Sequence, residues 1–402
     1  MTARPLHAVL LPPASGTGRL MDLLAAALDG SGPAILPVDP GLPPARLAGL
    51  LDALAPATIE TTQGTQRMLD RPSPGPATEL LPGTAVVIAT SGSTGEPKGV
   101  ELSAAALLHS ARASLDRIGA RGGDTWLACL PPSHIAGLQV LIRSLLAGAA
   151  PVVRERLDGA AVAAGCQFVS LVPTQLRRLM DGPDARAALS GFRRILLGGA
   201  AVPRGLLESA QAAGGNVTTT YGMTETCGGC VYDDVPLDGV SVEVGAGGRI
   251  QIAGPVLFSG YRGRPDLTGQ AMDGRWFVTS DVGELGESGR LTVMGRADGM
   301  INTGGEKVAA DEVAAALEAC PGVREAAVVG QPDAEWGEVV TAIVVPADPA
   351  SPPVLAALRA QLRGRLPDFA RPRALVLVAA LPLLPSGKPD LQALRALGRP
   401  GV

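Results

Sequence analysis

Short apolar runs alternate with longer amphipathic stretches over the first 220 residues of the chain. The runs are four to seven residues long and end at Gly, Pro or Thr, which is typical of buried strands. Between them, apolar positions recur at three- and four-residue spacing, which predicts helices. Strands are predicted at 84–90, 125–131, 168–173, 193–199 and 216–222, and helices at 103–119, 135–148, 173–182 and 202–214. This alternation predicts a parallel sheet built from β-α-β units.

The pattern changes twice further along the chain. From about residue 240, short strands separated by turn residues predict an antiparallel section, and after Arg296 helices and strands mix again. We therefore expect an α/β fold. A large N-terminal domain (1–297) would combine parallel β-α-β sheets with an antiparallel β section, followed by a small, mobile α+β C-terminal domain (298–402). Residues 70–84 are rich in Pro, which predicts a surface linker.

Composition narrows the classes of partner. The chain has 402 residues, of which 46% are hydrophobic and 18% charged, with a formal net charge of −4. That charge offers no basic field, so neither nucleic acid nor an anionic membrane is expected as a partner. The most apolar helical stretch is interrupted by Arg143, and the N-terminus lacks a signal peptide, so we expect a cytoplasmic protein.

The cysteines are too sparse for a disulfide framework, and we expect reduced thiols at Cys129, Cys166, Cys227, Cys230 and Cys320. Cys227 and Cys230 form a CxxC pair, which supplies only half of a zinc site. We favour the interpretation that they are simply two small residues in a glycine-rich loop. A metal-binding or redox role for the pair is the weaker alternative.

Lysine is rare, since only Lys98, Lys307 and Lys388 occur among 34 basic residues, and each follows a glycine-bearing loop. This favours positions where a compact ammonium is needed and a planar guanidinium does not serve. The first of these loops, "SGSTGEPKG" at 91–99, follows an apolar run, and its small residues and hydroxyls would suit a phosphate. It fits neither the Walker A spacing nor the GxGxxG dinucleotide fingerprint.

The segment "SGSTGEPKGV" resembles the phosphate loop of the acyl-adenylate-forming superfamily, which contains acyl-CoA synthetases, adenylation domains and luciferases. Four further segments in the same order support the resemblance: "TTTYGMTE" (218–225), "TSDVGEL" (279–285), "GRADGMINTGGEKV" (295–308) and "LPSGKPD" (384–390). The single loop is a weak signal, whereas the ordered set is specific. The resemblance implies that ATP, Mg²⁺ and CoA are used and that a carboxylic acid is the substrate.

The resemblance also implies roles for particular residues. Glu225 would be the magnesium carboxylate, Tyr221 would lie against adenine, and Asp281 with Arg296 would bind the ribose. The remaining ATP-binding residues would be Thr90, Ser91, Gly92, Ser93, Thr94, Gly95, Lys98, Gly198, Gly199, Ala200, Gly222 and Thr224. Taken singly, each could be an ordinary core, turn or solvated residue.

In this superfamily the C-terminal unit serves two half-reactions. Lys388 would reach the α-phosphate and the attacking carboxylate during adenylation. After rotation about Asp298, Gly304 and Gly305 would leave room for the pantetheine arm of CoA. Many relatives carry a second acidic residue where this chain has Gly299, which predicts a looser hinge.

The stretch 130–149, with "HIAG" before a helix, resembles o-succinylbenzoate:CoA ligases of menaquinone biosynthesis. His134 would line the acyl pocket and take part in catalysis, although it could instead cap the helix. Gln139 and Arg143 lie four apart on one helix face and would join it, Arg143 holding a second carboxylate, although it could instead face solvent. Relatives commonly have a longer region before the phosphate loop; a subunit contact could replace it, so a homodimer is also expected.

Three functions remain in competition. The first is a CoA ligase for an aromatic diacid. The second is an adenylating enzyme for another aryl or fatty acid, or an amino acid loaded on a carrier protein; no acidic residue for an ammonium opens the pocket segment, which disfavours amino acids. The third is a nucleotide-binding homologue without catalysis, which the retention of Lys98, Glu225 and Lys388 disfavours.

Overall fold

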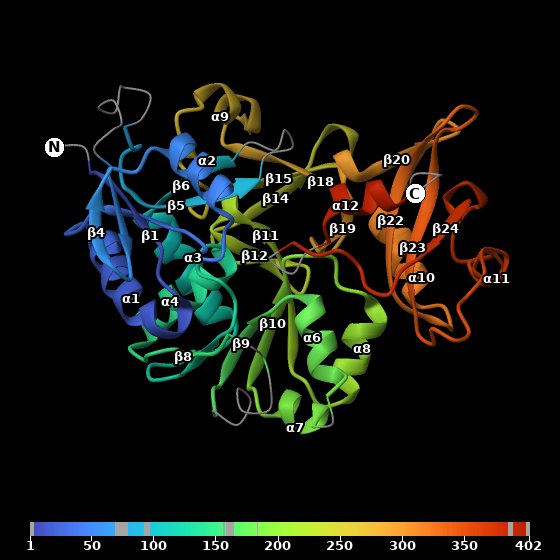
Figure 1. Ribbon diagram of the computed structural model, residues 1–402, viewed down its shortest axis with the longest axis horizontal. Coiled ribbons are helices and arrows are strands. Elements are labelled where there is room, and N and C mark those ends of the chain that lie inside the picture. Colours follow the sequence, from blue (N-terminus) through green and yellow to red (C-terminus); the bar gives the residue numbers. More distant parts are fainter. Residues whose placement is uncertain are drawn as a thin grey trace.

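A computed structural model describes residues 4–68, 79–91, 97–155, 157, 165–182, 184–384 and 389–398; for Ser91, Asp298 and Lys307 it describes the backbone only. Within these residues the strands form four sheets, two of seven and two of five strands. The first three sheets belong to the larger, N-terminal part, and the fourth belongs to the orange and red C-terminal part (Figure 1). The mixed α/β fold predicted from the sequence is confirmed.

The first sheet has the order β16-β6-β5-β2-β1-β3-β4. Strands β1, β2, β3 and β5 run parallel, whereas β5 and β6 form an antiparallel hairpin. Its strands are β1 (Leu6–Val9), β2 (Ala34–Pro37), β3 (Thr58–Thr61), β4 (Gly64–Arg67), β5 (Thr84–Ser91), β6 (Pro97–Ser103) and β16 (Gly260–Tyr261). The helices in this region are α1 (Pro13–Asp29), α2 (Pro44–Leu54) and α3 (Ala104–Arg117).

The second sheet has the order β13-β12-β11-β10-β9-β7-β8 and is parallel from β8 to β11. Its strands are β7 (Trp126–Ala128), β8 (Val152–Val153), β9 (Phe168–Leu171), β10 (Arg194–Gly198), β11 (Val217–Met223), β12 (Gly228–Tyr232) and β13 (Val235–Pro236). The helices are α4 (Ile135–Ala147), α6 (Pro173–Met180), α7 (Ala185–Ser190) and α8 (Arg204–Ala212). The strands and helices predicted between residues 84 and 222 are therefore present, at nearly the predicted positions.

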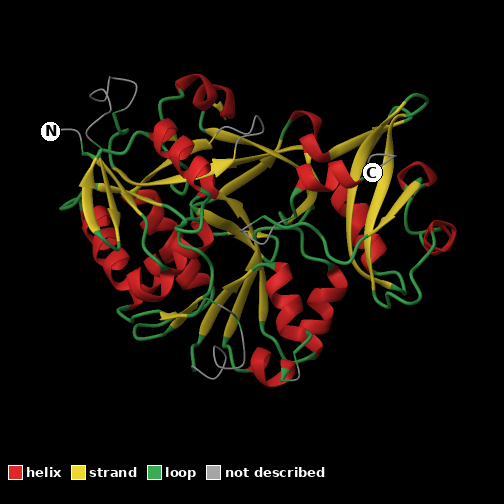
Figure 2. Ribbon diagram, viewed as in Figure 1, coloured by secondary structure: helices red, strands yellow, loops and turns green. Residues whose placement is uncertain are grey.

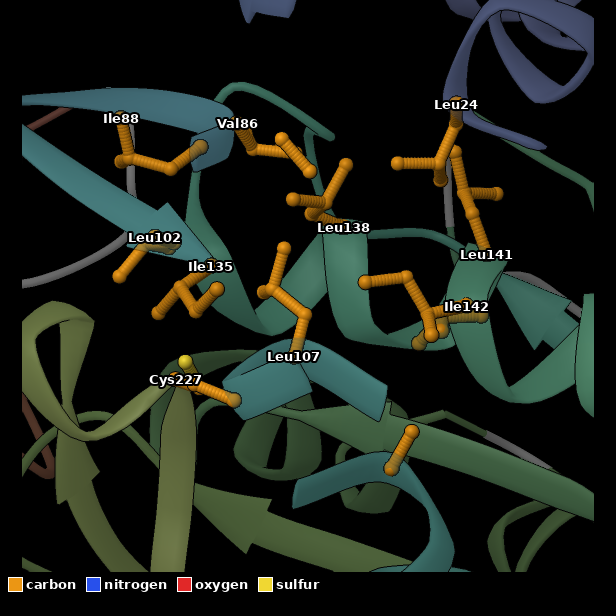
Figure 3. Packing of buried hydrophobic residues seen from close by; sticks show 14 of the residues in the cluster. Leu24, Val86, Ile88, Leu102, Leu107, Ile135, Leu138, Leu141, Ile142 and Cys227 are labelled. Atoms are coloured by element: carbon orange, nitrogen blue, oxygen red, sulfur yellow. The ribbon is translucent and has the colours of Figure 1, made fainter. Parts of the chain in front are cut away.

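The main core joins these two sheets. Helices α3 and α4 pack on each other, α3 against β6 and β12, and α4 against β7, β9 and β12. Leu107, Leu138 and Ile142 are fully buried there, together with side chains of the first sheet such as Val86 and Leu102 (Figure 3). Cys227 closes the same cluster from the second sheet. This packing fixes the segment that precedes Cys227, and that segment carries Glu225.

The third sheet is antiparallel and consists of β14 (Ser241–Val244), β15 (Arg249–Ala253), β17 (Met272–Asp273), β18 (Trp276–Leu285) and β19 (Leu291–Arg296), with α9 (Pro265–Ala271) beside it. The predicted antiparallel section is therefore confirmed. The chain then passes through a short 3-10 helix, Ala297–Gly299, into the fourth sheet.

Helices pack against the fourth sheet (Figure 2). This part of the molecule has a hydrophobic core of its own. It contains β20 (Met300–Thr303), β21 (Glu306–Ala309), β22 (Val323–Asp333), β23 (Gly337–Pro346) and β24 (Ala374–Leu377), with α10 (Ala310–Glu318), α11 (Leu355–Gln361) and α12 (Leu391–Leu397). Helix α11 ends at Gln361, and the chain continues as a turn. Among the described helices, none combines the length and hydropathy needed to cross a bilayer.

Candidate active site

The hairpin of β5 and β6 brings the two ends of the predicted phosphate loop together. Thr90 pairs with Lys98 across the hairpin, and the Thr90 hydroxyl donates to the Lys98 carbonyl at 3.4 Å. Residues Gly92, Ser93, Thr94 and Gly95 of the predicted loop lie outside the described residues, as does the side chain of Ser91. The strand register alone places Lys98 beside the start of that loop.

Glu225 lies in a tight turn between β11 and β12. The turn is a 3-10 helix, Thr224–Thr226, and Thr226 holds it closed: its hydroxyl accepts from the Met223 N–H at 2.9 Å and donates to the Gly228 carbonyl at 2.7 Å. The backbone of Glu225 is fixed as well, because its carbonyl accepts from the Phe258 N–H at 2.8 Å. The turn that carries Glu225 is thus held by several hydrogen bonds at the carboxyl end of β11 in the second sheet.

Tyr261, which the sequence analysis missed, joins these two groups. Its hydroxyl donates to Glu225 Oε1 at 2.8 Å, and its ring lies beneath the Lys98 ammonium, 5.6 Å from Nζ to the ring centroid. Burial raises the pKa of Tyr261 above its usual value, and the neighbouring Glu225 carboxylate raises it further. The only hint in the sequence was an aromatic residue in "SGYR" (259–262), which carries no motif of its own.

The predicted adenosine residues converge from β11, β18 and β19. The Tyr221 hydroxyl donates to Asp281 Oδ2 at 2.8 Å, and Asp281 is paired with Arg296 across the β18–β19 ladder. Burial, with Asp281 adding to it, raises the pKa of Tyr221, so this phenol stays protonated. Tyr221 and Asp281, which are far apart in the sequence, therefore share a hydrogen bond, and the strand register places Arg296 opposite Asp281.

Close backbone packing explains the glycines of this region. A Cβ on Gly198 would lie 2.2 Å from Thr220 Oγ1, and one on Gly222 would lie 2.1 Å from the Gly228 carbonyl oxygen. Gly199 has a φ of +83°, in the left-handed region that glycine adopts without strain. Gly198 is the last residue of β10, and Gly199 and Ala200 follow it. Strand β10 lies next to β11 in the parallel part of the sheet, and ligands of parallel sheets bind at this carboxyl end.

His134 occupies the N-cap position of α4, but its side chain makes no capping hydrogen bond. The capping alternative is therefore not what the structure shows. The neighbouring Ser133 hydroxyl is buried and has no hydrogen-bond partner among the described residues. The start of α4 thus presents one buried hydroxyl, that of Ser133, which the described residues leave without a hydrogen bond.

Gln139 and Arg143 lie elsewhere, in the core, at 5% and 4% relative exposure. The Arg143 guanidinium donates to the Gln139 carbonyl (3.1 Å), the Ser114 hydroxyl (3.0 Å) and the Ser170 hydroxyl (3.1 Å). It also stacks on the Trp126 ring at 4.2 Å. Gln139 donates to the Cys227 carbonyl at 2.8 Å. For Arg143 the expectation of acyl binding is corrected, because helix α4 is buried around nearly its whole circumference and each guanidinium nitrogen donates to a protein oxygen. Gln139 is also buried, but its Oε1 has no hydrogen bond to any described residue, so its role stays a prediction.

In the C-terminal part, Gly304 and Gly305 form the turn between β20 and β21, both with positive φ. A Cβ on Gly304 would lie 2.8 Å from the Trp336 ring, whereas one on Gly305 would meet open space. Lys388 lies outside the described residues, as does the side chain of Asp298, the predicted hinge. The roles of all four residues stay predictions.

An ion pair between described residues connects the two parts of the molecule. Arg177 of α6 donates to Glu318 Oε2 of α10 at 2.9 Å and also to the Arg324 carbonyl. Both charged side chains are mostly buried, with 21% and 12% relative exposure. Glu318 is held from its own side by the Ala326 N–H at 3.1 Å. This contact specifies one orientation of the C-terminal part.

The five cysteines are free and buried, and burial raises the pKa of each thiol. Within the described part of the chain, no group of three or more His, Cys, Asp or Glu side chains could hold a metal ion. The described residues thus give no support to the alternative of a metal site at Cys227 and Cys230.

Comparison with known proteins agrees with this geometry. Residues 74–262 match the model of the AMP-binding enzyme family, and residues 312–388 match the model of the AMP-binding enzyme C-terminal domain. A probable 2-succinylbenzoate–CoA ligase of Mycobacterium tuberculosis is 42% identical over 401 residues, with 97% of each chain covered. The compact length is therefore shared with that relative. A 2-succinylbenzoate–CoA ligase of Bacillus cereus is 34% identical over 285 residues, covering 64% of this chain and 59% of that protein.

Two solved structures extend the likeness to three dimensions. One is the o-succinylbenzoate CoA synthetase MenE of Bacillus subtilis in complex with the acyl-adenylate intermediate OSB-AMP, with a TM-score of 0.80 at 25% identity, covering 98% of this chain and 88% of that chain. The other is ATP-bound MatB of Rhodopseudomonas palustris, with a TM-score of 0.84 at 25% identity, covering 98% and 89%. The chain belongs to the AMP-binding enzyme family.

Proposed function

We propose that this chain is an ATP-dependent acid:CoA ligase that converts 2-succinylbenzoate to its CoA thioester through an acyl-adenylate, in the cytoplasm and as a step of menaquinone biosynthesis. One observation carries the proposal. The structure gathers Lys98, Glu225 and the Tyr221–Asp281 pair, which come from three distant segments, around the carboxyl end of the second sheet. The identity of the acid is inferred from the relatives named as 2-succinylbenzoate–CoA ligases.

The chemistry explains why such a site is needed. A carboxylate is a poor electrophile and hydroxide is a poor leaving group, so a thioester cannot form directly. Attack of the carboxylate oxygen on the α-phosphorus of ATP forms an acyl-adenylate and releases pyrophosphate. The CoA thiol then attacks the acyl carbon, and the bond between that carbon and the bridging oxygen breaks to release AMP.

Negative charge grows on pyrophosphate as it leaves. The Lys98 ammonium and the N–H groups of the loop that follows Thr90 would bind that charge, which lowers the barrier of the first step. Lys98 has no ion-pair partner among the described residues, so its charge is available to a ligand.

The residues also fit Mg²⁺. This ion prefers one or two carboxylates together with phosphate oxygens and water, and dedicated protein cages for it are rare. Glu225 offers one carboxylate whose Oε1 is fixed by Tyr261, and the described residues contain no cluster of three acidic or His ligands that would hold the ion unaided. Bound between Glu225 and the phosphates, the ion would neutralise phosphate charge.

The nucleoside would lie against the other polar group. The Tyr221 ring offers a flat face for adenine, and its hydroxyl orients the Asp281 carboxylate toward the ribose hydroxyls, with Arg296 beside it. Gly198, Gly199 and Ala200 are small and would let the backbone approach the base closely.

The acid would lie at the start of α4. His134 and the buried, unpaired Ser133 hydroxyl are polar groups there that could meet the second carboxylate of 2-succinylbenzoate, whose burial without a partner would cost several kcal/mol. Backbone N–H groups and ordered water are the other candidates for this role.

The C-terminal part would act twice. Lys388 would bind the α-phosphate and the attacking carboxylate in the adenylation step. After rotation about Asp298, the Gly304–Gly305 turn would face the site and admit pantetheine, and the open space at Gly305 is consistent with this role. The Arg177–Glu318 pair would have to break during that rotation.

The test is pyrophosphate release with a panel of carboxylic acids, measured with and without CoA. We expect 2-succinylbenzoate to give the highest kcat/KM and to yield a CoA thioester and AMP. A preference for another aryl or fatty acid would keep the ligase chemistry and change the substrate. Absence of pyrophosphate release with every acid would leave a non-catalytic nucleotide-binding homologue.

A further inference from the structure

Tyr261 has no role in the chemistry described so far, yet it touches both groups that face the phosphates. Its hydroxyl donates to Glu225 Oε1 at 2.8 Å, and its ring lies 5.6 Å from the Lys98 ammonium. Tyr261 thus contacts a carboxylate through its hydroxyl and a cation through its ring.

The position of Tyr261 is fixed from several sides. Strand β16 pairs with β6, so that Tyr261 lies opposite Val100, two residues from Lys98. The Tyr261 N–H donates to the Thr268 hydroxyl at 2.9 Å. Its ring packs edge-on against Phe258, with the two centroids 5.0 Å apart. A side chain held this firmly can orient a group that it contacts.

The same short segment holds Glu225 twice. The Phe258 N–H donates to the Glu225 carbonyl, and the Tyr261 hydroxyl donates to its carboxylate. The second carboxylate oxygen, Oε2, has no hydrogen bond to any described residue. The carboxylate therefore has one oxygen fixed by the protein and one available to a ligand.

We propose that Tyr261 is a positioning residue, which fixes one oxygen of Glu225 so that the other faces the metal–triphosphate complex. This inference rests on the proposed function and deepens it. It predicts that loss of the hydroxyl weakens the part of ATP binding that depends on Mg²⁺ and spares the part that does not.

The experiment compares Tyr261→Phe with Tyr232→Phe in the full-length protein. Tyr232 is a matched control, because its hydroxyl is also hydrogen-bonded, to Ser114 Oγ at 2.8 Å, and the residue is buried in the main core without a hydrogen bond to Glu225. Calorimetric titration with ATP is run with Mg²⁺ and, separately, with chelator. Thermal unfolding is followed for both variants, and titrations are made well below both midpoints.

We expect Tyr261→Phe to reduce the gain in ATP affinity on adding Mg²⁺ by about tenfold, with an unchanged affinity in chelator. Tyr232→Phe should retain the full Mg²⁺-dependent gain. An unchanged gain in Tyr261→Phe would overturn the inference, as would an equal loss in both variants, because an equal loss indicates a general effect on packing.

The wild-type protein separates this inference from the function on which it rests. If the wild type shows no exchange of pyrophosphate into ATP with any acid, the proposed function fails. If the wild type catalyses this exchange but Tyr261→Phe keeps the full Mg²⁺-dependent gain, only the role of Tyr261 fails.

Discussion

Two polar clusters of the N-terminal part differ in how far the protein satisfies them. In the core cluster, made of Arg143, Ser114, Ser170 and the backbone carbonyl of Gln139, each nitrogen of the guanidinium already donates to a protein oxygen. In the phosphate cluster, made of Lys98, Tyr261 and Glu225, the described contacts of the ammonium and the carboxylate leave room for a ligand. A polar residue in an apolar helix is thus a poor indicator of a ligand site, whereas an incompletely bonded charge is a better one.

The largest effect expected from this difference is at Glu225. Glu225→Gln keeps an acceptor for Tyr261 but removes the charge, so adenylation should fall by about 100-fold or more while the unfolding midpoint changes little. Exchange of pyrophosphate into ATP and thermal unfolding measure the two quantities. Normal exchange at saturating Mg²⁺ would remove Glu225 from the site.

Arg143 should behave in the opposite way. Arg143→Met leaves the two serine hydroxyls and a carbonyl short of a donor, so we expect a loss of about 2 kcal/mol or more in the free energy of unfolding. The KM for the acid should stay within about twofold of the wild type, because the guanidinium is bonded inside the protein.

Arg193→Met is the matched control for that variant. Arg193 also stacks on an aromatic ring, Phe168, but it is partly exposed and pairs with Asp124, so its loss should cost at most about 1 kcal/mol. A tenfold rise in the KM for the acid in Arg143→Met, with stability retained, would restore Arg143 as the carboxylate partner and break the comparison.

Tyr221 lies between the two cases, since its hydroxyl is bonded to a protein carboxylate that itself is proposed to bind a ligand. Tyr221→Phe retains the ring but leaves Asp281 less well oriented. We expect the KM for ATP to rise about fivefold, which corresponds to about 1 kcal/mol, with the KM for the acid unchanged. Steady-state kinetics checks this, and an equal rise in both constants would indicate general disorder of the site.

The smallest effect is expected at Arg177. Its guanidinium is paired with Glu318, which belongs to the other part of the molecule. Arg177→Ala should shift the rates of the two half-reactions by about two- to fivefold in opposite directions, because it weakens one orientation only. Single-turnover assays of adenylate formation and of thioester formation from supplied acyl-adenylate measure this. Equal changes in both rates would show that the pair does not select an orientation.

Sequence patterns were sufficient for most of the fold. Residues 84–222 show clear apolar runs, and the five ordered motifs indicated Tyr221, Asp281, Arg296 and Glu225, which the structure brings to one end of the second sheet. These candidates could be named from the sequence because each lies in a local motif whose neighbours are informative.

The remainder depends on pairing between distant segments. Tyr261 reaches Glu225 because the two-residue strand β16 pairs with β6, and no local pattern predicts such a pairing. Arg143 was assigned to the acyl site because helical spacing identifies residues that share a face, but spacing cannot reveal that α4 is buried on nearly every face. Both outcomes concern tertiary packing, which overrides local patterns.

The central claim is that an acyl-adenylate forms, and transfer of oxygen tests it most directly. The protein is incubated with ATP, Mg²⁺, CoA and 2-succinylbenzoate whose carboxylates carry ¹⁸O, and the products are analysed by mass spectrometry. Because the attacking carboxylate oxygen remains on phosphorus when the thiol displaces AMP, we expect one ¹⁸O in AMP and none in pyrophosphate. Label in inorganic phosphate with formation of ADP, or thioester formation with unlabelled AMP, would contradict the account.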